Sequence, residues 1–356
     1  MTKAAELAKM GEVLTNSQIG GRRNIIINGA MQVAQRGTSS TGLGANATTY
    51  LVDRFAASAN ATAGRFTMTQ TADGPSGFAN CLKLDCTTAD TSIAAAEFLL
   101  LEQRIEGQNI QQLKKGTADA EKFTVSFYAK SNASRDIVLE IFEDENTRHV
   151  AKLFTIGTSW ARYSYTFPGD TSGTLDDDNG IGFYVSFFLH AGSTYTSGTL
   201  PASWANNSNG NRAAGVDSFF SSTDNTFFIT GVQMEVGSVA TPFEHRSFGE
   251  ELRLCQRYFQ KLGAGYYAAN AVGTTKLTTG FPLATAIRAA PSSVTAPTSE
   301  FHRSGNQNSS SATIDAIVLA HNNSFLSLRL TGFSSLTDEV AQVVYNNNEM
   351  SIDAEL

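Results

Sequence analysis

Residues Ile181–Leu189 have the sequence IGFYVSFFL, and residues Phe123–Ala129 have the sequence FTVSFYA. Both stretches are short and rich in aromatic and β-branched residues, a composition typical of strands. A turn-forming cluster, Asp176–Gly180, directly precedes the first of them. We therefore predict that both are strands and that strands of this kind build the fold.

Working outward, strand-like stretches of the same texture continue from Arg22 to Arg246 with no helical pattern between them. The others are Asn24–Ile27, Leu51–Phe55, Arg65–Gln70, Ala79–Asp85, Phe98–Ile105, Ile137–Phe142, Val150–Ile156, Trp160–Phe167 and Phe227–Val236. This pattern predicts a mainly β chain whose residues 22–246 form an antiparallel jelly-roll sandwich. The long segment Ala191–Asp224 interrupts the series and is typical of a functional or disordered loop.

Two short helices are expected. In residues 1–21, Leu7, Met10 and Leu14 lie at helical spacing, and so short a helix needs a partner unless it is a frayed terminus. In residues 247–262, Ser247 and Glu250 form a capping box. There an apolar seam suits either an oligomer axis or packing on the chain's own sheet, and its members are Phe248, Leu252, Cys255, Phe259 and Leu262.

Residues 263–356 are again β in texture and predict a second, smaller sandwich. Its candidate strands are Thr274–Phe281, Thr313–Leu319, Phe325–Thr331, Val340–Tyr345 and Met350–Glu355.

Composition excludes several classes of protein. The net charge is −7, whereas a nucleic-acid binder needs a basic surface. No apolar run has the length of about 18 residues that a membrane-spanning helix needs. The three cysteines are too few for a disulfide scaffold.

We find no sequence signature of catalysis. The zinc, nucleophile-elbow and P-loop motifs do not occur, so no catalytic residue, metal or cofactor is predicted. Asp176–Asp178 lack the order of a calcium loop and better fit a tight turn. The strand glutamates, among them Glu102 and Glu140, leave open a less favoured interpretation as a glycoside hydrolase.

The sequence does offer groups suited to neutral polar ligands. Sugars are held by aromatic rings together with amide, carboxylate and imidazole groups. The candidates are Tyr195, Trp204 and Asn206 in the long segment and His302, Asn306, Asn308, His321 and Tyr345 near the C-terminal end. The alternative is structural, with Trp204 anchoring its loop and the asparagines making turns.

Several stretches resemble a family of phage tail-fibre and receptor-binding proteins. They are NIIINGAMQVAQRG (Asn24–Gly37), YLVDRF (Tyr50–Phe55), QRIEGQ (Gln103–Gln108), FTVSFYAKS (Phe123–Ser131), WARYSYTFPGDT (Trp160–Thr171), DNGIG (Asp178–Gly182) and the dense block Phe227–Tyr258. The middle of the chain also resembles carbohydrate-binding jelly rolls. The resemblance ends in the C-terminal part, where only IDAEL (Ile352–Leu356) is similar.

The resemblance implies a homotrimeric virion protein, made in the host cytoplasm. It would attach to phage tail, baseplate or adaptor proteins through its N-terminal end, where Leu7, Met10 and Leu14 lie. It would bind a host surface polysaccharide or an outer-membrane receptor without cleaving it. The alternatives are a purely structural tail adaptor or fibre segment and, less favoured, a polysaccharide-degrading tailspike.

Overall fold

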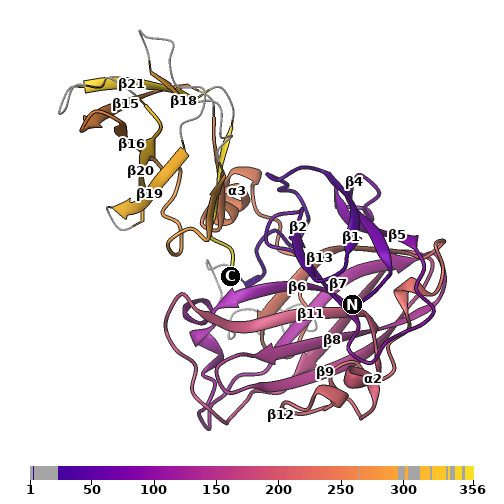
Figure 1. The fold of residues 1–356 in the computed structure, drawn as a ribbon. Helices are drawn as coiled ribbons and strands as arrows, with labels where there is room; N and C mark the ends of the chain where they lie inside the picture. The colour runs from indigo at the N-terminus through magenta and orange to yellow at the C-terminus, as the bar shows by residue number, and fades with distance from the viewer. Residues whose placement is uncertain are drawn as a thin grey trace. The chain divides into compact units, whose positions relative to one another are not determined.

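The computed structural model describes residues 3, 23–263, 265–295, 301–303, 313–320, 323–333, 336, 341–346 and 349–356. It divides into two compact units, Met1–Phe248 with Leu356 and Gly249–Glu355 (Figure 1). The predicted N-terminal helix, with Leu7, Met10 and Leu14, lies outside the described residues.

The first unit consists of two antiparallel sheets. The first sheet runs in the order β1 (Ser39–Gly44), β4 (Arg65–Thr71), β5 (Cys81–Thr88), β13 (Thr226–Val236), β7 (Phe123–Ser131) and β10 (Ala161–Phe167). The second runs β12 (Ala205–Asn206), β9 (Arg148–Ile156), β8 (Arg135–Glu143), β11 (Ile181–Ala191), β6 (Phe98–Glu106), β3 (Ala56–Asn60) and β2 (Ala47–Tyr50). The predicted jelly-roll sandwich is confirmed.

A single apolar core lies between these sheets. On β7, alternate residues such as Phe123 and Phe127 point inward, and on β11 Phe183 and Phe187 do the same. All four rings are almost fully buried, and the rings of Phe127 and Phe187 meet edge to face at 4.9 Å. The alternation that predicted the strands is therefore the alternation between core and surface.

Most predicted strands of this unit are confirmed, but Asn24–Ile27 and Leu51–Phe55 are not strands. Strands β1 and β2 lie between these two stretches, and β3 follows the second. All three are in sequence rich in glycine, serine, threonine and alanine. The apolar side chains of the two mispredicted stretches still enter the core, as Ile26 and Leu51 do, but their backbones join no ladder.

Side chains hold the segment from Asn24 in place, and we call this arrangement the N-terminal clasp. The side chain of Asn24 accepts a hydrogen bond from Met234 N (3.0 Å) and donates one to Val232 O (3.1 Å), both on β13. The backbone N of Asn24 donates to Glu244 Oε2 (2.6 Å), and Arg246 donates to the carbonyl oxygens of Asn24 and Ile26. The clasp thus joins two segments that are 220 residues apart in sequence.

The long segment between β11 and β13 contains α2 (Ser193–Thr196), β12 and short 3-10 turns, and we call residues 192–225 the insertion. Figure 1 shows α2 and β12 beside the β9 side of the second sheet. A separate apolar cluster lies on the outer face of that sheet, where Leu100, Val138 and Phe188 are buried against Tyr195 and Val216. The insertion therefore covers part of this outer face.

The second unit is the smaller sandwich that the sequence predicts. One sheet has the order β14 (Phe259–Leu262), β22 (Met350–Asp353) and β17 (Ser293–Thr295). The other has the order β18 (Phe301–Arg303), β21 (Ala341–Asn346), β15 (Gly265–Val272), β16 (Lys276–Pro282), β20 (Phe325–Thr331) and β19 (Thr313–Ala320). Residues of both sheets, including Leu277, Leu328 and Ile352, share one core.

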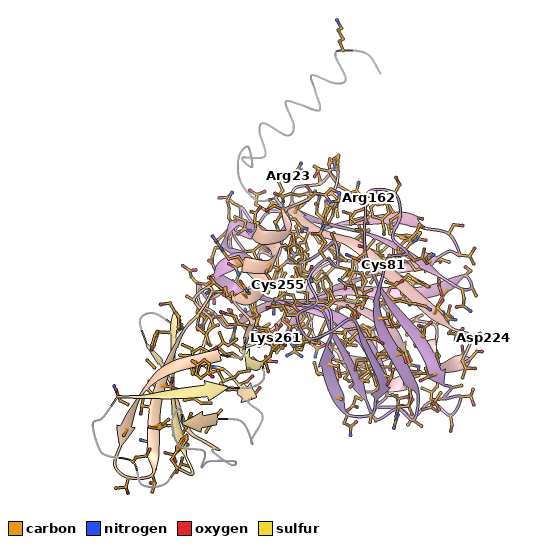
Figure 2. The ribbon with its side chains drawn as sticks, turned by 90° about the horizontal axis from the view of Figure 1, so that it is seen from above. Arg23, Cys81, Arg162, Asp224, Cys255 and Lys261 are labelled. Atoms are coloured by element: carbon orange, nitrogen blue, oxygen red, sulfur yellow. The ribbon has the colours of Figure 1, made fainter. Side chains whose placement is uncertain are left out.

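The predicted helix over residues 247–262 is wrong in its second half. Helix α3 spans Phe248–Gln256, and Phe259 and Leu262 lie on β14. The backbone from Phe259 pairs with β22 instead of continuing the helix. Cys255, which lies on α3 (Figure 2), and Phe259 are buried, while Leu252 is half-buried and Phe248 is exposed. The five residues therefore do not form one helical seam.

Candidate functional site

A groove of about 300 Å³ lies on the outer face of the second sheet of the first unit, beside the insertion. Its residues come from β2, β3, β6, β8 and β11, from the turn after β8 and from the insertion. The polar and charged ones are Thr48, Ser58, Glu102, Arg104, Asp144 and Arg212, and the apolar and aromatic ones are Phe98, Leu100, Phe142 and Tyr184.

Strand alternation and register bring these residues together. On β6, Leu99 and Leu101 point into the core, so Glu102 and Arg104 point outward. Arg104 pairs with Tyr184 on β11, and Tyr184 pairs with Phe142 on β8. Three strands that are distant in sequence therefore place an arginine and two rings in one row.

Glu102 and Arg104 form an ordered ion pair at the floor of the groove. Arg104 Nη2 and Nε lie 2.7 and 3.0 Å from Glu102 Oε1, and Ser58 Oγ donates to the same oxygen at 3.2 Å. Glu102 is 5% exposed. Its Oε2 contacts Ser186 Oγ at 3.5 Å, which leaves this oxygen able to accept a stronger hydrogen bond from a ligand.

The side chain of Arg104 is held by further contacts. Burial works against its charged form, but Glu102 outweighs this and raises the pKa of Arg104. Its guanidinium lies 5.5 Å from the centre of the Tyr184 ring, and Nη1 donates to the Leu356 carbonyl oxygen. Arg104 is thus a fixed cation in the groove.

Arg212 forms the wall of the groove on the side of the insertion. Its Nε and Nη2 bind both oxygens of Glu140 at 2.7 to 3.1 Å, and His149 Nδ1 lies 2.8 Å from Glu140 Oε1. Glu140 and His149 are fully buried. The guanidinium also lies 4.9 Å from the centre of the Phe142 ring. Because Glu140 uses Nε and Nη2, Arg212 Nη1 is the donor left for other partners.

Tyr184 and Phe142 supply aromatic surface. Both are half-buried, and their rings meet edge to face at 5.9 Å. Burial and the neighbouring Asp144 carboxylate raise the pKa of Tyr184 to about 12. Its protonated hydroxyl is hydrogen-bonded to the Asp144 carboxylate.

The charges of the groove nearly cancel. Two carboxylates (Glu102 and Asp144) and two guanidinium groups (Arg104 and Arg212) line it. Fixed donors and acceptors beside aromatic rings suit a ligand with many hydroxyls and apolar CH faces. A strongly charged ligand of either sign would find little net complementary charge.

Two carboxylates share a row, which is relevant to the hydrolase alternative. Glu102 and Glu140 both pair with Ser186, from opposite sides of β11. However, Glu140 is fully buried beneath Arg212, so only Glu102 reaches the groove. Glycoside hydrolysis by two carboxylates needs both of them beside the scissile bond.

Trp204 does not line the groove. Its Nε1 donates to Pro168 O at 2.7 Å, and its ring packs against Phe183 at 5.6 Å between ring centres. It is half-buried at the edge of the main core. This is the anchoring role that the sequence left as the alternative to ligand binding.

Of the other two candidate residues in the insertion, one lies next to the groove and the other does not. The Tyr195 ring packs edge to face on Phe98 at 5.5 Å, and Phe98 lines the groove. The exposed Asn206 accepts a hydrogen bond from Arg148 Nη1 at 2.9 Å, away from the groove residues. Tyr195 is thus the predicted residue that lies next to the groove.

In the second unit, two predicted residues lie on adjacent strands. His302 of β18 pairs with Tyr345 of β21, which in turn pairs with Tyr266 of β15. Tyr266 is 69% exposed and was missed in the sequence. Asn306, Asn308 and His321 lie outside the described residues.

A hydrogen-bonded chain of Ser218, His190 and Glu97 lies elsewhere on the first unit. His190 Nδ1 is 2.9 Å from Ser218 Oγ, and His190 Nε2 is 3.1 Å from Glu97 Oε2. His190 is fully buried, and the Phe220 ring lies 5.2 Å from its own. Because the imidazole is covered, this chain has the geometry of a structural link between the insertion and the sheet.

Among the described residues, no group of three or more His, Cys, Asp or Glu side chains is placed to hold a metal ion. Asp178 Oδ1 accepts a hydrogen bond from Gly180 N at 2.8 Å, as expected for the turn before β11. No helix in the described part of the chain has the length and apolarity to span a membrane.

No protein-family model matches the sequence, and a search of curated proteins finds no match. Three similar solved structures are the enzymatically active domain of bacteriophage CBA120 tailspike protein 4, TmCBM61 in complex with β-1,4-galactotriose, and the family 11 carbohydrate-binding module of Clostridium thermocellum in complex with a mixed-linked tetrasaccharide.

Their identities to this chain are 12%, 10% and 13%, with TM-scores of 0.29, 0.30 and 0.27. The matches cover 60%, 61% and 57% of this chain, and 21%, 100% and 98% of the other chains. The match to the tailspike domain is thus confined to about a fifth of that chain. At these identities and TM-scores, the likenesses carry no argument about function.

Proposed function

We propose that the chain binds a bacterial surface glycan in the groove of the first unit and does not cleave it. The observation that carries the proposal is the row formed by Arg104, Tyr184 and Phe142, together with Glu102 beneath it. Its donors and acceptors are fixed by ion pairs before any ligand arrives, which reduces the entropic cost of binding.

We propose further that this binding attaches a phage particle to its host. The sequence resemblance to tail-fibre proteins supports this step, and it implies a homotrimer in the virion bound to tail proteins through the N-terminal end. Three copies of one weak site would give avidity wherever the geometry allows simultaneous binding. A purely structural adaptor remains the alternative, and the absence of glycan binding would favour it.

The test is binding of the purified full chain to an array of bacterial O-chains and capsular polysaccharides. We expect binding, and Tyr184→Ala should weaken it about tenfold, because one stacked ring contributes about 0.5–1.5 kcal/mol beyond its buried area. Tyr128→Ala is the matched control, since Tyr128 is a half-buried tyrosine on the other sheet, packed on Phe78 at 5.2 Å.

Three outcomes would contradict the proposal. Binding to no glycan would favour the structural adaptor. Equal loss in the Tyr184→Ala and Tyr128→Ala variants would place the binding site outside the groove. Release of reducing sugar from a bound polysaccharide, abolished by Glu102→Gln, would establish a hydrolase.

A further inference from the structure

We infer that the groove accepts the end of a glycan chain and not an internal stretch. This inference rests on the proposed function and adds the class of ligand. It comes from the insertion, which limits the groove on two sides.

The first limit lies toward β8 and β9. An internal stretch of a polysaccharide needs a channel that continues across the outer face of the sheet. Beyond Phe142 this face is covered, because its partner His149 on β9 is fully buried beside Glu140. Farther along the strands, Val138 and Phe188 are fully buried in the apolar cluster under the insertion. Removing that cover would expose their apolar area to water, at about 25 cal/mol per Å².

Arg212 fixes the edge of this cover. Its Nε and Nη2 make charge-assisted bonds to the one carboxylate of the buried Glu140, which gives them a fixed geometry. The Phe142 and Phe188 rings lie 4.9 and 5.5 Å from its guanidinium carbon. Arg212 is therefore held by hydrogen bonds to Glu140 and also by contacts with the Phe142 and Phe188 rings.

The second limit lies at the start of β6. There Tyr195 packs edge to face on Phe98, which lines the groove. Backbone hydrogen bonds hold the helix that carries Tyr195 against the residues before β6, from Gly192 N to Glu97 O (2.8 Å) and from Thr194 N to Ala95 O (2.9 Å). These backbone bonds hold Tyr195 in place, and its ring closes this side.

The groove is open toward β2, the edge strand of the sheet, where Thr48 lines it. The volume of about 300 Å³ is at the lower end for ligand pockets, which span about 300–1,000 Å³. A small groove bounded on two sides holds a short terminal segment, while the rest of the chain extends outward into solvent.

The experiment prints each array polysaccharide together with its own fragments of one to six sugar units. For every glycan that binds, the Kd of each fragment is measured by titration calorimetry with the full chain. We expect the Kd to fall from one unit to two or three and then to stay within about twofold.

Partial hydrolysis of the intact polysaccharide gives an independent measurement. The hydrolysed polysaccharide is used as a competitor for binding of the full chain to the printed intact polysaccharide. Its inhibitory capacity per unit mass should rise in proportion to the number of chain ends created. Tyr195→Ala, which opens the side at Phe98, should extend the length dependence to longer fragments, whereas the control Tyr128→Ala should not.

A Kd that keeps falling about fivefold per unit up to six units would overturn the inference while leaving glycan binding intact. A fall in the inhibitory capacity per unit mass after hydrolysis would overturn it as well. Failure of every glycan to bind would instead contradict the proposed function itself.

Discussion

Replacing Arg212 by methionine should destabilise the first unit more than any ordinary surface substitution. The fully buried Glu140 would lose its charge-assisted bonds from Arg212 Nε and Nη2 and keep His149 as a partner. Removing one partner of a buried ion pair costs about 3–5 kcal/mol. The Arg212 side chain is 21% exposed, so we expect the lower end of that range, about 3 kcal/mol.

Methionine keeps an apolar stem beside Phe142 and Phe188, which separates the loss of charge from the loss of packing. The assay is urea unfolding of the full chain, followed by thermal unfolding of the same variant. For a unit of this size, a loss of about 3 kcal/mol corresponds to a fall of about 6–12 °C in Tm.

A double-mutant cycle tests the reasoning itself. With Glu140→Gln in the Arg212→Met background, the buried charge is gone and about 2 kcal/mol of the loss should return. A loss below about 1 kcal/mol for Arg212→Met would refute the argument, and so would strictly additive effects of the two substitutions.

Three further predictions test individual side chains. Trp204→Ala should cost up to about 3 kcal/mol in urea unfolding because an anchoring ring is lost, and an altered glycan profile would instead return Trp204 to the binding site. Burial lowers the pKa of His190, although Glu97 acts in the opposite direction. The contribution of His190 to the free energy of unfolding should therefore be fully present above the unfolded pKa of about 6.5. It should be lost as the pH falls below that value, by at most about 1.4 kcal/mol per pH unit. His190→Gln should remove this contribution, and an unchanged pH slope would contradict it. Burial raises the pKa of Cys81 to about 12 and all three cysteines are buried, so a thiol reagent at pH 8 should react with the folded chain only after unfolding, and rapid labelling would show that this is wrong.

The sequence predicts the sandwich well because most strands alternate between core and surface. It fails where that signal is missing. Strand β3 (Ala56–Asn60, AASAN) contains small residues with little strand preference, yet it completes the sheet beside β6. Conversely, Asn24–Ile27 has the composition of a strand but is held by the N-terminal clasp.

The groove could not be predicted from the sequence, for a different reason. Glu102, Phe142, Tyr184 and Arg212 are spread over more than 100 residues, and only register unites them. Alternation along β6 marks Glu102 and Arg104 as outward-facing, but it does not tell which strands lie beside them. The sequence pointed to the aromatic residues of the insertion, where Trp204 bonds to Pro168 O and Tyr195 packs on Phe98 beside the groove.

The N-terminal clasp has a mechanical consequence. Tension applied between the segment at Asn24 and the segment at Arg246 loads the hydrogen bonds that join them directly. Part of the load also passes into the sheets, to β13 through Asn24 and to β6 through the bonds between Ile27 and Gln103. A pull on the two ends of the first unit is therefore resisted by the side-chain bonds of the clasp as well as by the paired strands.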